Sequence, residues 1–278
     1  MTTLRTLERR RIDSPAARAV IFNADDFGFT RDVNAGIIHC HEHGVLGSTT
    51  LMANGDAFDH AVRLAHENPT LDVGCHLVLV QGRSLLTGEP LPATPSKLII
   101  ALLRGSIDIA AELRAQVERI QAAGLRPLHL DTHKHTHLHP EVFNQVVRVA
   151  QRYGIPFVRL PVDRSFKVGA PARSFQRRRL QRARLSSTDH FTGFHLTGHL
   201  TVETMLAELH ALGAGTTEFM CHPGFVSEEL NAATTRLKQS RLREIEALTS
   251  PRVRAFLDEQ HILVANYRVL CGPPGEAA

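Results

Sequence analysis

The chain has 278 residues, of which 43% are hydrophobic and 22% charged, and its formal net charge is +4. This length fits one large α/β domain or two small ones, and the charge is too small to indicate a nucleic-acid partner. The apolar run at 98–103 is too short to cross a bilayer, and the basic N-terminus lacks the apolar core of a secretory signal. Four scattered cysteines are typical of a reducing compartment. We therefore expect a soluble, cytoplasmic protein.

From residue 19 onward, short apolar runs alternate with amphipathic stretches of helical length. The first run, 19–26, ends in polar residues and is followed by a helical stretch at 31–44. Further strands are expected at 46–54, 71–80, 127–133, 156–161, 217–224 and 261–270. Further helices are expected at 56–69, 107–124, 140–154 and 201–215, with one or two more at 239–260. Repeated strand–helix units predict a parallel sheet wound by helices. Because no G-x-G-x-x-G fingerprint is present, we predict a single-domain (β/α) barrel rather than a dinucleotide-binding sheet.

The barrel domain is expected to span residues 19–270 as one unit, since the sequence contains no linker or internal repeat. We expect residues 1–18 to be flexible and the Gly- and Pro-containing tail, 271–278, to be disordered. Two less regular stretches, near 81–97 and at 163–195, are predicted to be loops inserted over the rim of the barrel.

Polar side chains gather where the predicted strands end. In barrels of parallel strands, the chemistry lies at the carboxyl ends of the strands. The residues at these ends that can bind a metal, move a proton or form a hydrogen bond are Asp25, Asp26, Asn54, His76, His133 and His222. Their shared position predicts one active site at this rim.

Asp25 and Asp26 are adjacent carboxylates, which repel each other unless a positive charge lies beside them. A divalent cation removes this repulsion, because one carboxylate can bind it while the other stays free as a base. A helix N-cap or a solvated turn is the alternative interpretation of the pair. His76 has apolar neighbours on both sides, so a buried core histidine is the alternative there to a metal ligand.

The stretch "HLDTHKHTHLHP" contains five histidines at alternating positions, His129, His133, His135, His137 and His139 among residues 129–140. Two positions along a strand advance about 6.7 Å, whereas ligands of one zinc ion lie about 3–3.5 Å from each other. Consecutive alternating histidines therefore cannot all bind one ion. We predict one or two ligands here, with His135 and His137 in a loop on the rim and His139 at the entry to the next helix.

His222 lies where a predicted strand meets a Pro-Gly turn, and a histidine there can act as a general acid. A nucleophilic pair with Cys221 is disfavoured, because neighbours on a strand point to opposite faces. One aspartate and two histidines leave a catalytic metal with an open coordination position. With a second aspartate as base, this set predicts a metal-dependent hydrolase of an amide or ester. A metal-dependent phosphodiesterase and a non-catalytic sugar- or lipid-binding barrel are the alternatives.

Five motifs occur in order between about residues 19 and 226: "NADDFGFTRDVNAGI", "GSTTLMANGDAFDHAV", "VGCHLVLVQGRSLL", "HLDTHKHTHLHP" and "CHPG". Together they resemble the YdjC-like carbohydrate deacetylases, the ChbG/HpnK group. The resemblance implies a TIM-barrel-like (β/α) barrel that removes the acetyl group from an N-acetylated sugar with one divalent metal ion.

The resemblance also implies a role for each matching residue. The implied metal ligands are Asp26, His76 and His133, the implied base is Asp25 and the implied acid is His222. Nearby substrate-binding or supporting positions are implied for Asn54, His135, His137 and Arg159. The donor set suits Zn²⁺, and a mixed oxygen and nitrogen site also admits Mg²⁺, Mn²⁺ or Co²⁺.

Within the family, "HLVLVQGRSLL" and "HKHTHLHP" are most similar to the hopanoid-associated HpnK branch. That branch implies an N-acetylglucosamine-bearing hopanoid lipid as substrate, and soluble chitooligosaccharides are the alternative. Six arginines between Arg173 and Arg184 suit contact with an anionic membrane surface, so that the protein would lie at the periphery of the inner membrane. A solvated helix face explains this run equally well. The sequence defines no oligomeric state, and related proteins are compatible with a homodimer.

Overall fold

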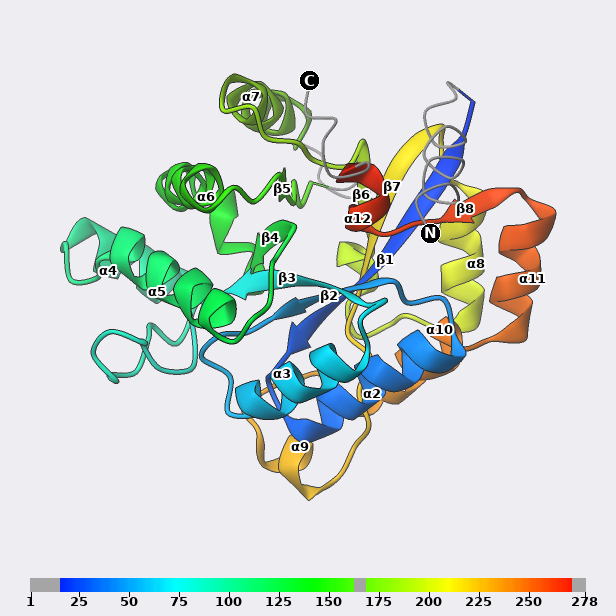
Figure 1. Cartoon of the computed structure of the whole chain (residues 1–278), viewed down its shortest axis with the longest axis horizontal. Helices are drawn as coiled ribbons and strands as arrows, with labels where there is room; N and C mark the ends of the chain where they lie inside the picture. The colour runs from blue at the N-terminus through cyan, green and yellow to red at the C-terminus, as the bar shows by residue number, and fades with distance from the viewer. Residues whose placement is uncertain (1–15, 163–168, 272–278) are drawn as a thin grey trace.

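The computed structural model describes residues 16–162 and 169–271, and in this part of the chain eight parallel strands form one curled sheet (Figure 1). The order along the sheet is β5-β4-β3-β2-β1-β7-β6, with β8 paired to the start of β1. Phe157 also bridges to Ser186, on the segment that leads to β6. The predicted TIM-barrel-like α/β fold, in a single domain, is confirmed. The strands are β1 (Arg18–Phe27), β2 (Ser48–Leu51), β3 (Asp72–Leu77), β4 (His129–Thr132), β5 (Phe157–Val158), β6 (His190–Thr192), β7 (Gly215–Cys221) and β8 (Ile262–Val264).

Helices surround the curled sheet (Figure 1). The main apolar core lies between them and the outward-facing residues of the strands, such as Phe22, Cys75 and Leu130. The α-helices are α2 (Arg31–His43), α3 (Phe58–Glu67), α4 (Pro95–Leu103), α5 (Ile109–Ala122), α6 (Pro140–Tyr153), α7 (Gly169–Arg182), α8 (Val202–His210), α9 (Glu228–Ala232), α10 (Gln239–Leu248), α11 (Pro251–Glu259) and α12 (Tyr267–Cys271), and the short 3₁₀ helices are η1 (His133–Leu138) and η2 (Phe194–Leu196).

Local sequence explains where α6 begins and ends. His139 is the N-cap residue, and its Nδ1 accepts a hydrogen bond from the backbone N–H of Glu141. Pro140 occupies the first turn, where a missing N–H is not needed. Gly154 ends the helix in the left-handed conformation, with φ of 65°. The predicted helix at 140–154 and the predicted entry role of His139 are both confirmed.

The structure differs from the sequence interpretation in three segments. The apolar run after the 81–97 loop forms α4. The region 163–195, predicted as an inserted loop, contains α7 and β6 and supplies a regular strand of the sheet; its residues 163–168 lie outside the described part of the chain. The sequence did not predict this helix because few of its described residues are buried, among them Gln176 and Leu180. An arginine-rich helix of this kind lacks a clear apolar face. Most of the predicted flexible segment 1–18 and nearly all of the predicted tail 271–278 also lie outside the described residues.

The third difference is the end of the chain, where 261–270 was predicted to be one strand. β8 instead ends at Val264, and α12 follows. Asn266 explains the change, because its side-chain oxygen accepts a hydrogen bond from the backbone N–H of Val269 at 3.1 Å. The turn brings Tyr267 onto the ring of His129, with ring centroids 3.9 Å apart. This aromatic pair helps to close one end of the barrel.

The interior of the barrel changes from apolar to polar along β1. Ala19 and Ile21 belong to a small inner apolar cluster, whereas Val20 and Phe22 belong to the outer core. The same alternation should turn the next residues in the inner series, Asn23 and Asp25, into the barrel. Both are buried and hydrogen-bonded to other inner side chains. The polar end of the interior is therefore the carboxyl end of the strands, where the sequence places the active site.

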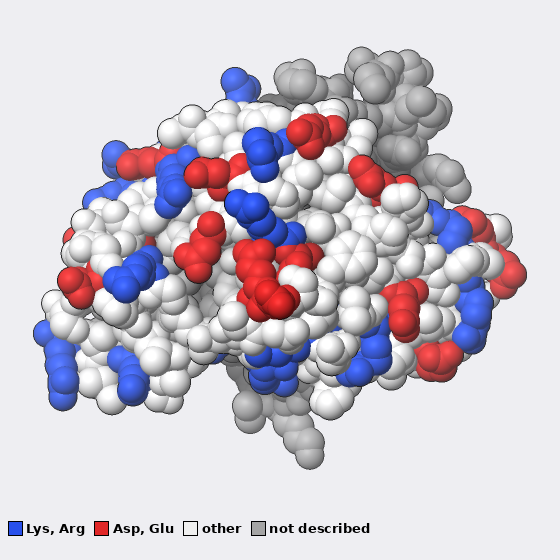
Figure 2. All heavy atoms as spheres, turned by 90° about the horizontal axis from the view of Figure 1, so that it is seen from below, with Lys and Arg blue, Asp and Glu red and all other residues white. Residues whose placement is uncertain are grey.

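The surface carries mixed charge. On the face in Figure 2, basic and acidic side chains are interspersed. Two of the six arginines of the basic run are engaged within the protein, because Arg173 and Arg177 both donate to the backbone oxygen of Asp189. None of the described helices has the length and apolar character needed to cross a membrane. Contact of the basic run with a membrane surface stays a prediction.

Gly74 of β3 makes room for an interior ring, and this generates a test of the packing. A Cβ atom at Gly74 would lie 2.5 Å from His129 Nε2. We expect Gly74→Ala to lower the free energy of unfolding by about 1–3 kcal/mol, because the interior must shift to admit the methyl group. Urea unfolding followed by circular dichroism measures this change. Gly213→Ala is the matched control, since a Cβ there meets no atom closer than 4.0 Å; equal stability of both variants would contradict the packing argument.

Candidate active site

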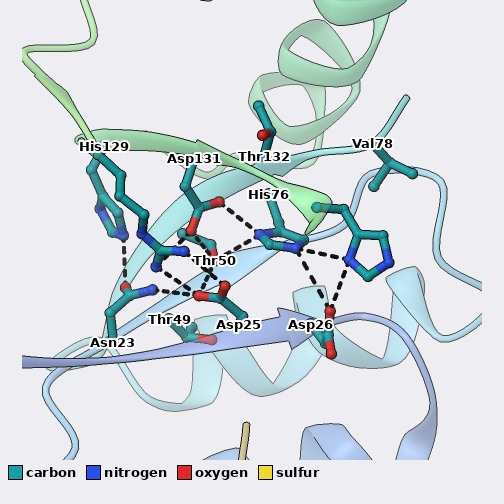
Figure 3. Close-up of polar contacts among 12 residues, drawn as sticks. Asn23, Asp25, Asp26, Thr49, Thr50, His76, Val78, His129, Asp131 and Thr132 are labelled. Atoms are coloured by element: carbon teal, nitrogen blue, oxygen red, sulfur yellow. Dashed lines mark hydrogen bonds and ion pairs between the residues drawn. The ribbon is translucent and has the colours of Figure 1, made fainter. Parts of the chain in front are cut away.

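Two adjacent aspartates at the end of β1 reach the same site because the strand is irregular there. Regular alternation would turn Asp26 away from the interior. Instead its φ is 70°, in the left-handed region, and the pairing of β1 with β2 shifts register between Ala24 and Phe27. The turn that follows is closed by hydrogen bonds from Phe29 N to Asp26 O and from Gly28 N to Asn34 Oδ1. Asp25 and Asp26 consequently lie side by side at the carboxyl end of the strand (Figure 3).

Asp26, His76 and His133 form a compact group of metal-binding side chains. Asp26 Oδ1 lies 3.6 Å from His76 Nε2 and 3.3 Å from His133 Nδ1, and the two ring nitrogens are 3.2 Å apart. Ligands at about 2.0–2.2 Å from one zinc ion lie about 3–3.5 Å from each other, so these distances fit a shared cation. The aspartate and His76 are buried, and His133 is partly exposed. The three residues could therefore hold a metal ion that solvent or a substrate can reach.

Buried partners fix the orientation of two of these ligands. Asp131 Oδ1 lies 2.7 Å from His76 Nδ1, an arrangement that leaves Nε2 facing the group. Burial lowers the pKa of His76, but the carboxylate of Asp131 outweighs it and raises this pKa to about 9. The surroundings thus favour positive charge at this position. On the other side, Arg241 donates to Asp26 Oδ2 at 2.6 Å, so that Oδ1 is the oxygen facing the histidines.

Asp25 is held by a buried arginine rather than by the histidines. Arg159 donates to both of its carboxylate oxygens at 2.7 Å, and Asn23 Nδ2 donates to Oδ1 at 3.1 Å. Burial alone would raise the pKa of Asp25. The guanidinium of Arg159 outweighs this effect and holds the pKa below the usual range of an aspartate. Asp25 therefore stays ionised beside the metal-binding group and can accept a proton.

Arg159 lies in the barrel interior, where it contacts three carboxylates. Besides Asp25 it forms ion pairs of 2.7 Å with Asp131 and Glu218. Only 2% of the residue is exposed. Asp25, His76 and Asp131 make a second group of metal-binding residues, but the guanidinium already supplies positive charge to both of its carboxylates. Of the two roles that the resemblance implied for Arg159, support of the site agrees with this geometry better than contact with a substrate.

His222 follows β7 and is nearly buried, with 9% exposed. Burial lowers its pKa to about 4, while the charges of Asp25 and Asp26 act in the opposite direction. Its backbone N–H donates to the buried carboxylate of Glu244. Cys221, by contrast, lies in the outer core, as expected for a strand neighbour. His222 is thus close enough to Asp25 and Asp26 for their charges to act on it. The Cys221 thiol lies on the other side of the strand, in the outer core.

The histidine-rich stretch divides into different roles, and within the described chain only His133 joins the group with Asp26 and His76. His129 lies inside the barrel, with Nε2 2.9 Å from Asn23 Oδ1. His137 is fully buried between Thr132 Oγ1 and the backbone oxygen of Arg159, so both ring nitrogens are engaged within the protein.

His135 is buried beside the rim, and its contact with a substrate stays a prediction. It is 7% exposed and has φ of 51°. Its ring lies against Phe191 and Phe194, and its Nδ1 has no hydrogen-bond partner among the described residues. Asn54, the other predicted contact, donates to the backbone oxygen of Arg83 at 2.9 Å and so holds a segment of the rim.

Sequence reasoning assigned no role to several residues that orient the site. Asp131 shares the inward alternation of His129 and His133, so the strand pattern contained a signal for it. Arg241 lies on α10, more than 200 residues from the aspartate it contacts. Neither its helix nor its neighbours carry a local pattern that distinguishes it from a surface arginine.

Comparisons with known proteins agree with this geometry. The family model described as YdjC-like protein matches residues 19–259. The chain belongs to the YdjC-like family. Among similar YdjC-like relatives, a carbohydrate deacetylase of Geobacillus stearothermophilus is 36% identical over 264 residues, which covers 90% of this chain and 97% of the relative. A chitooligosaccharide deacetylase of Salmonella paratyphi B is 34% identical over 250 residues, with 87% and 95% covered.

A solved structure is also similar to this YdjC-like chain. It is a protein of Enterococcus faecalis V583 whose proposed activity is cellobiose-phosphate cleavage. The two align with a TM-score of 0.77 and 28% identity, over 91% of this chain and 99% of the other. The curled sheet that positions the site is thus shared with a relative.

The division of the histidines generates a direct test. We expect His133→Ala to lose most of its bound metal, because it removes one of three ligands. Elemental analysis of the purified protein measures the metal content. His139→Ala is the control, since that ring caps α6 and is not part of the group. Equal metal loss in the two variants would contradict the arrangement described above.

Proposed function

We propose that this YdjC-like protein is a metal-dependent hydrolase that removes the acetyl group from an N-acetylglucosamine-type sugar. The observation that carries the proposal is the convergence of Asp26, His76 and His133 within ligand distance of each other, beside the ionised Asp25. Relatives that are 34–36% identical over nearly the whole chain are a carbohydrate deacetylase and a chitooligosaccharide deacetylase, which supports the same reaction.

Asp26, His76 and His133 would hold the metal. A bound divalent cation would polarise the amide carbonyl and make water a stronger acid. Asp25 accepts the proton of the attacking water, since Arg159 keeps its carboxylate ionised. His222 is proposed to give a proton to the leaving amine. The charges of both aspartates raise its pKa, but burial outweighs them and lowers it to about 4. His135 is proposed to contact the sugar.

The donor set favours zinc. Two imidazole nitrogens and one carboxylate oxygen are common ligands of catalytic zinc sites, while Mg²⁺ prefers oxygen donors. We therefore propose Zn²⁺, with Mg²⁺, Mn²⁺ and Co²⁺ as alternatives to be compared in the same assay.

The relatives support soluble oligosaccharides as the first substrates to test, because one of them is a chitooligosaccharide deacetylase. A hopanoid lipid as carrier of the sugar, contact with the inner membrane, a homodimer and a cytoplasmic location stay predictions from the sequence.

Product analysis tests the proposed reaction. Metal-free protein is reloaded with each cation and incubated with chitooligosaccharides, with N-acetylglucosaminyl lipids and with phosphodiester model substrates. We expect acetate release from the acetylated sugars, fastest with zinc. Phosphate ester cleavage without acetate release would favour the phosphodiesterase alternative instead.

Asp25→Asn tests the base. An amide cannot accept the proton of water, so we expect turnover to fall by about 10²–10⁴-fold. Metal content should remain unchanged, because Asp25 is not among the three ligands. Acetate release and elemental analysis are measured on the same sample, with the exposed Asp59→Asn as control. Full activity of Asp25→Asn would show that another group takes the proton.

A further inference from the structure

The outer ring nitrogen of His133, Nε2, faces the side chain of Gln81. His133 Nδ1 is the atom that faces Asp26 and His76, and Nε2 lies 3.3 Å from Gln81 Oε1. A neutral imidazole carries its proton on one ring nitrogen only. A histidine that binds a metal through Nδ1 must therefore carry the proton on Nε2. The amide oxygen of Gln81 is placed to accept that proton in a hydrogen bond.

The two histidines of the group are oriented by different kinds of partner. His76 offers Nε2 to the group and has its Nδ1 beside the carboxylate of Asp131 at 2.7 Å. His133 offers Nδ1 and has its Nε2 beside the neutral amide of Gln81. With both outer nitrogens donating, two nitrogen lone pairs and one oxygen of Asp26 face the same point. A cation at that point is what makes this arrangement favourable.

The backbone at Gln81 is strained in a way that places its side chain. Gln81 has φ of 63° and Gly82 has φ of 67°, so two consecutive residues are left-handed. Such conformations persist only where the surroundings determine them, and they are common at functional sites. Here Gln81 N–H donates to Pro92 O at 2.9 Å, and Leu91 N–H donates to Gly82 O at 3.0 Å. The residues 81–92 thus fold back on themselves as a closed loop.

This closed loop is tied to the body of the barrel at a buried acid. Glu112 of α5 is 1% exposed and accepts from Ser84 Oγ at 2.6 Å and from Leu85 N at 3.1 Å. Asn54 adds a hydrogen bond to Arg83 O. The loop is therefore fixed to the barrel at residues 83–85, directly after Gln81, which limits the freedom of the amide to leave His133.

We infer that Gln81 is a positioning residue of the metal centre, which holds His133 in the tautomer that leaves Nδ1 free to bind the cation. The inference rests on the metal role proposed for Asp26, His76 and His133. Loss of an outer hydrogen-bond partner of a metal-binding histidine commonly weakens metal affinity by about 10–100-fold. The same loss is expected here when the amide oxygen is removed.

Zinc affinity of the full chain tests the inference without reference to turnover. The dissociation constant is measured by competition with a chromophoric chelator at one pH. We expect Gln81→Ala to raise it by about 10–100-fold. Gln81→Glu should stay close to the unmodified protein, because a carboxylate oxygen accepts the same N–H. Arg83→Ala is the matched control on the same loop, since its exposed side chain bonds only to Gly88 O among the described residues.

A second measurement separates positioning from misfolding. The visible absorption of the Co²⁺-loaded protein reports ligand geometry, so it should change in Gln81→Ala and not in Arg83→Ala. Thermal unfolding of the metal-free variants should be alike.

Zinc affinity of Gln81→Ala equal to that of the unmodified protein would overturn the inference, as would equal weakness of the Ala and Glu variants. Unchanged affinity of His133→Ala, measured in parallel, would instead refute the metal role itself and the inference with it.

Discussion

The site depends on one buried cation, the guanidinium of Arg159. It bonds to Asp25, Asp131 and Glu218 in the barrel interior at 2.7 Å each. Through Asp25 it keeps the proposed base ionised, and through Asp131 it supports the partner of His76. Removing one partner from a buried network of charges is strongly destabilising, because the remaining charges cannot be solvated. A change at Arg159 would therefore disturb base, ligand and fold together.

The buried carboxylates around this arginine and Arg241 outnumber the two guanidiniums. The carboxylates that the two guanidiniums contact are those of Asp25, Asp26, Asp131 and Glu218. Four negative charges against two positive ones leave an excess of two when the histidines are neutral. The divalent cation proposed at the group of Asp26, His76 and His133 would neutralise this excess.

Sequence patterns predicted what strand periodicity and helix caps determine. The ends of the predicted strands placed Asp25, Asp26, His76 and His133 at one rim, and spacing excluded a cage of five histidines. They predicted that Asp25 and Asp26 share the site, but not how two adjacent strand residues can do so, since that depends on a left-handed residue in an irregular strand. They also could not distinguish the buried His137 from the partly exposed His133, because burial is decided by distant elements.

Long-range contacts account for the other differences. Arg241 and Gln81 owe their roles to where α10 and the closed loop lie in three dimensions. The strand β6 was not predicted because it has only three residues and follows a helix with little apolar surface. The three residues that the family resemblance implies as metal ligands converge in space, but the resemblance does not by itself explain which atoms orient them.

The contact between Arg241 and Asp26 has a consequence for the order in which the protein is made. All three proposed ligands lie within the first 133 residues, and they leave the ribosome early. The guanidinium that holds Asp26 in place comes from α10, near the end of the chain. During synthesis the ligands therefore exist well before the group that orients one of them. A chain that has not yet reached α10 therefore lacks this restraint on Asp26.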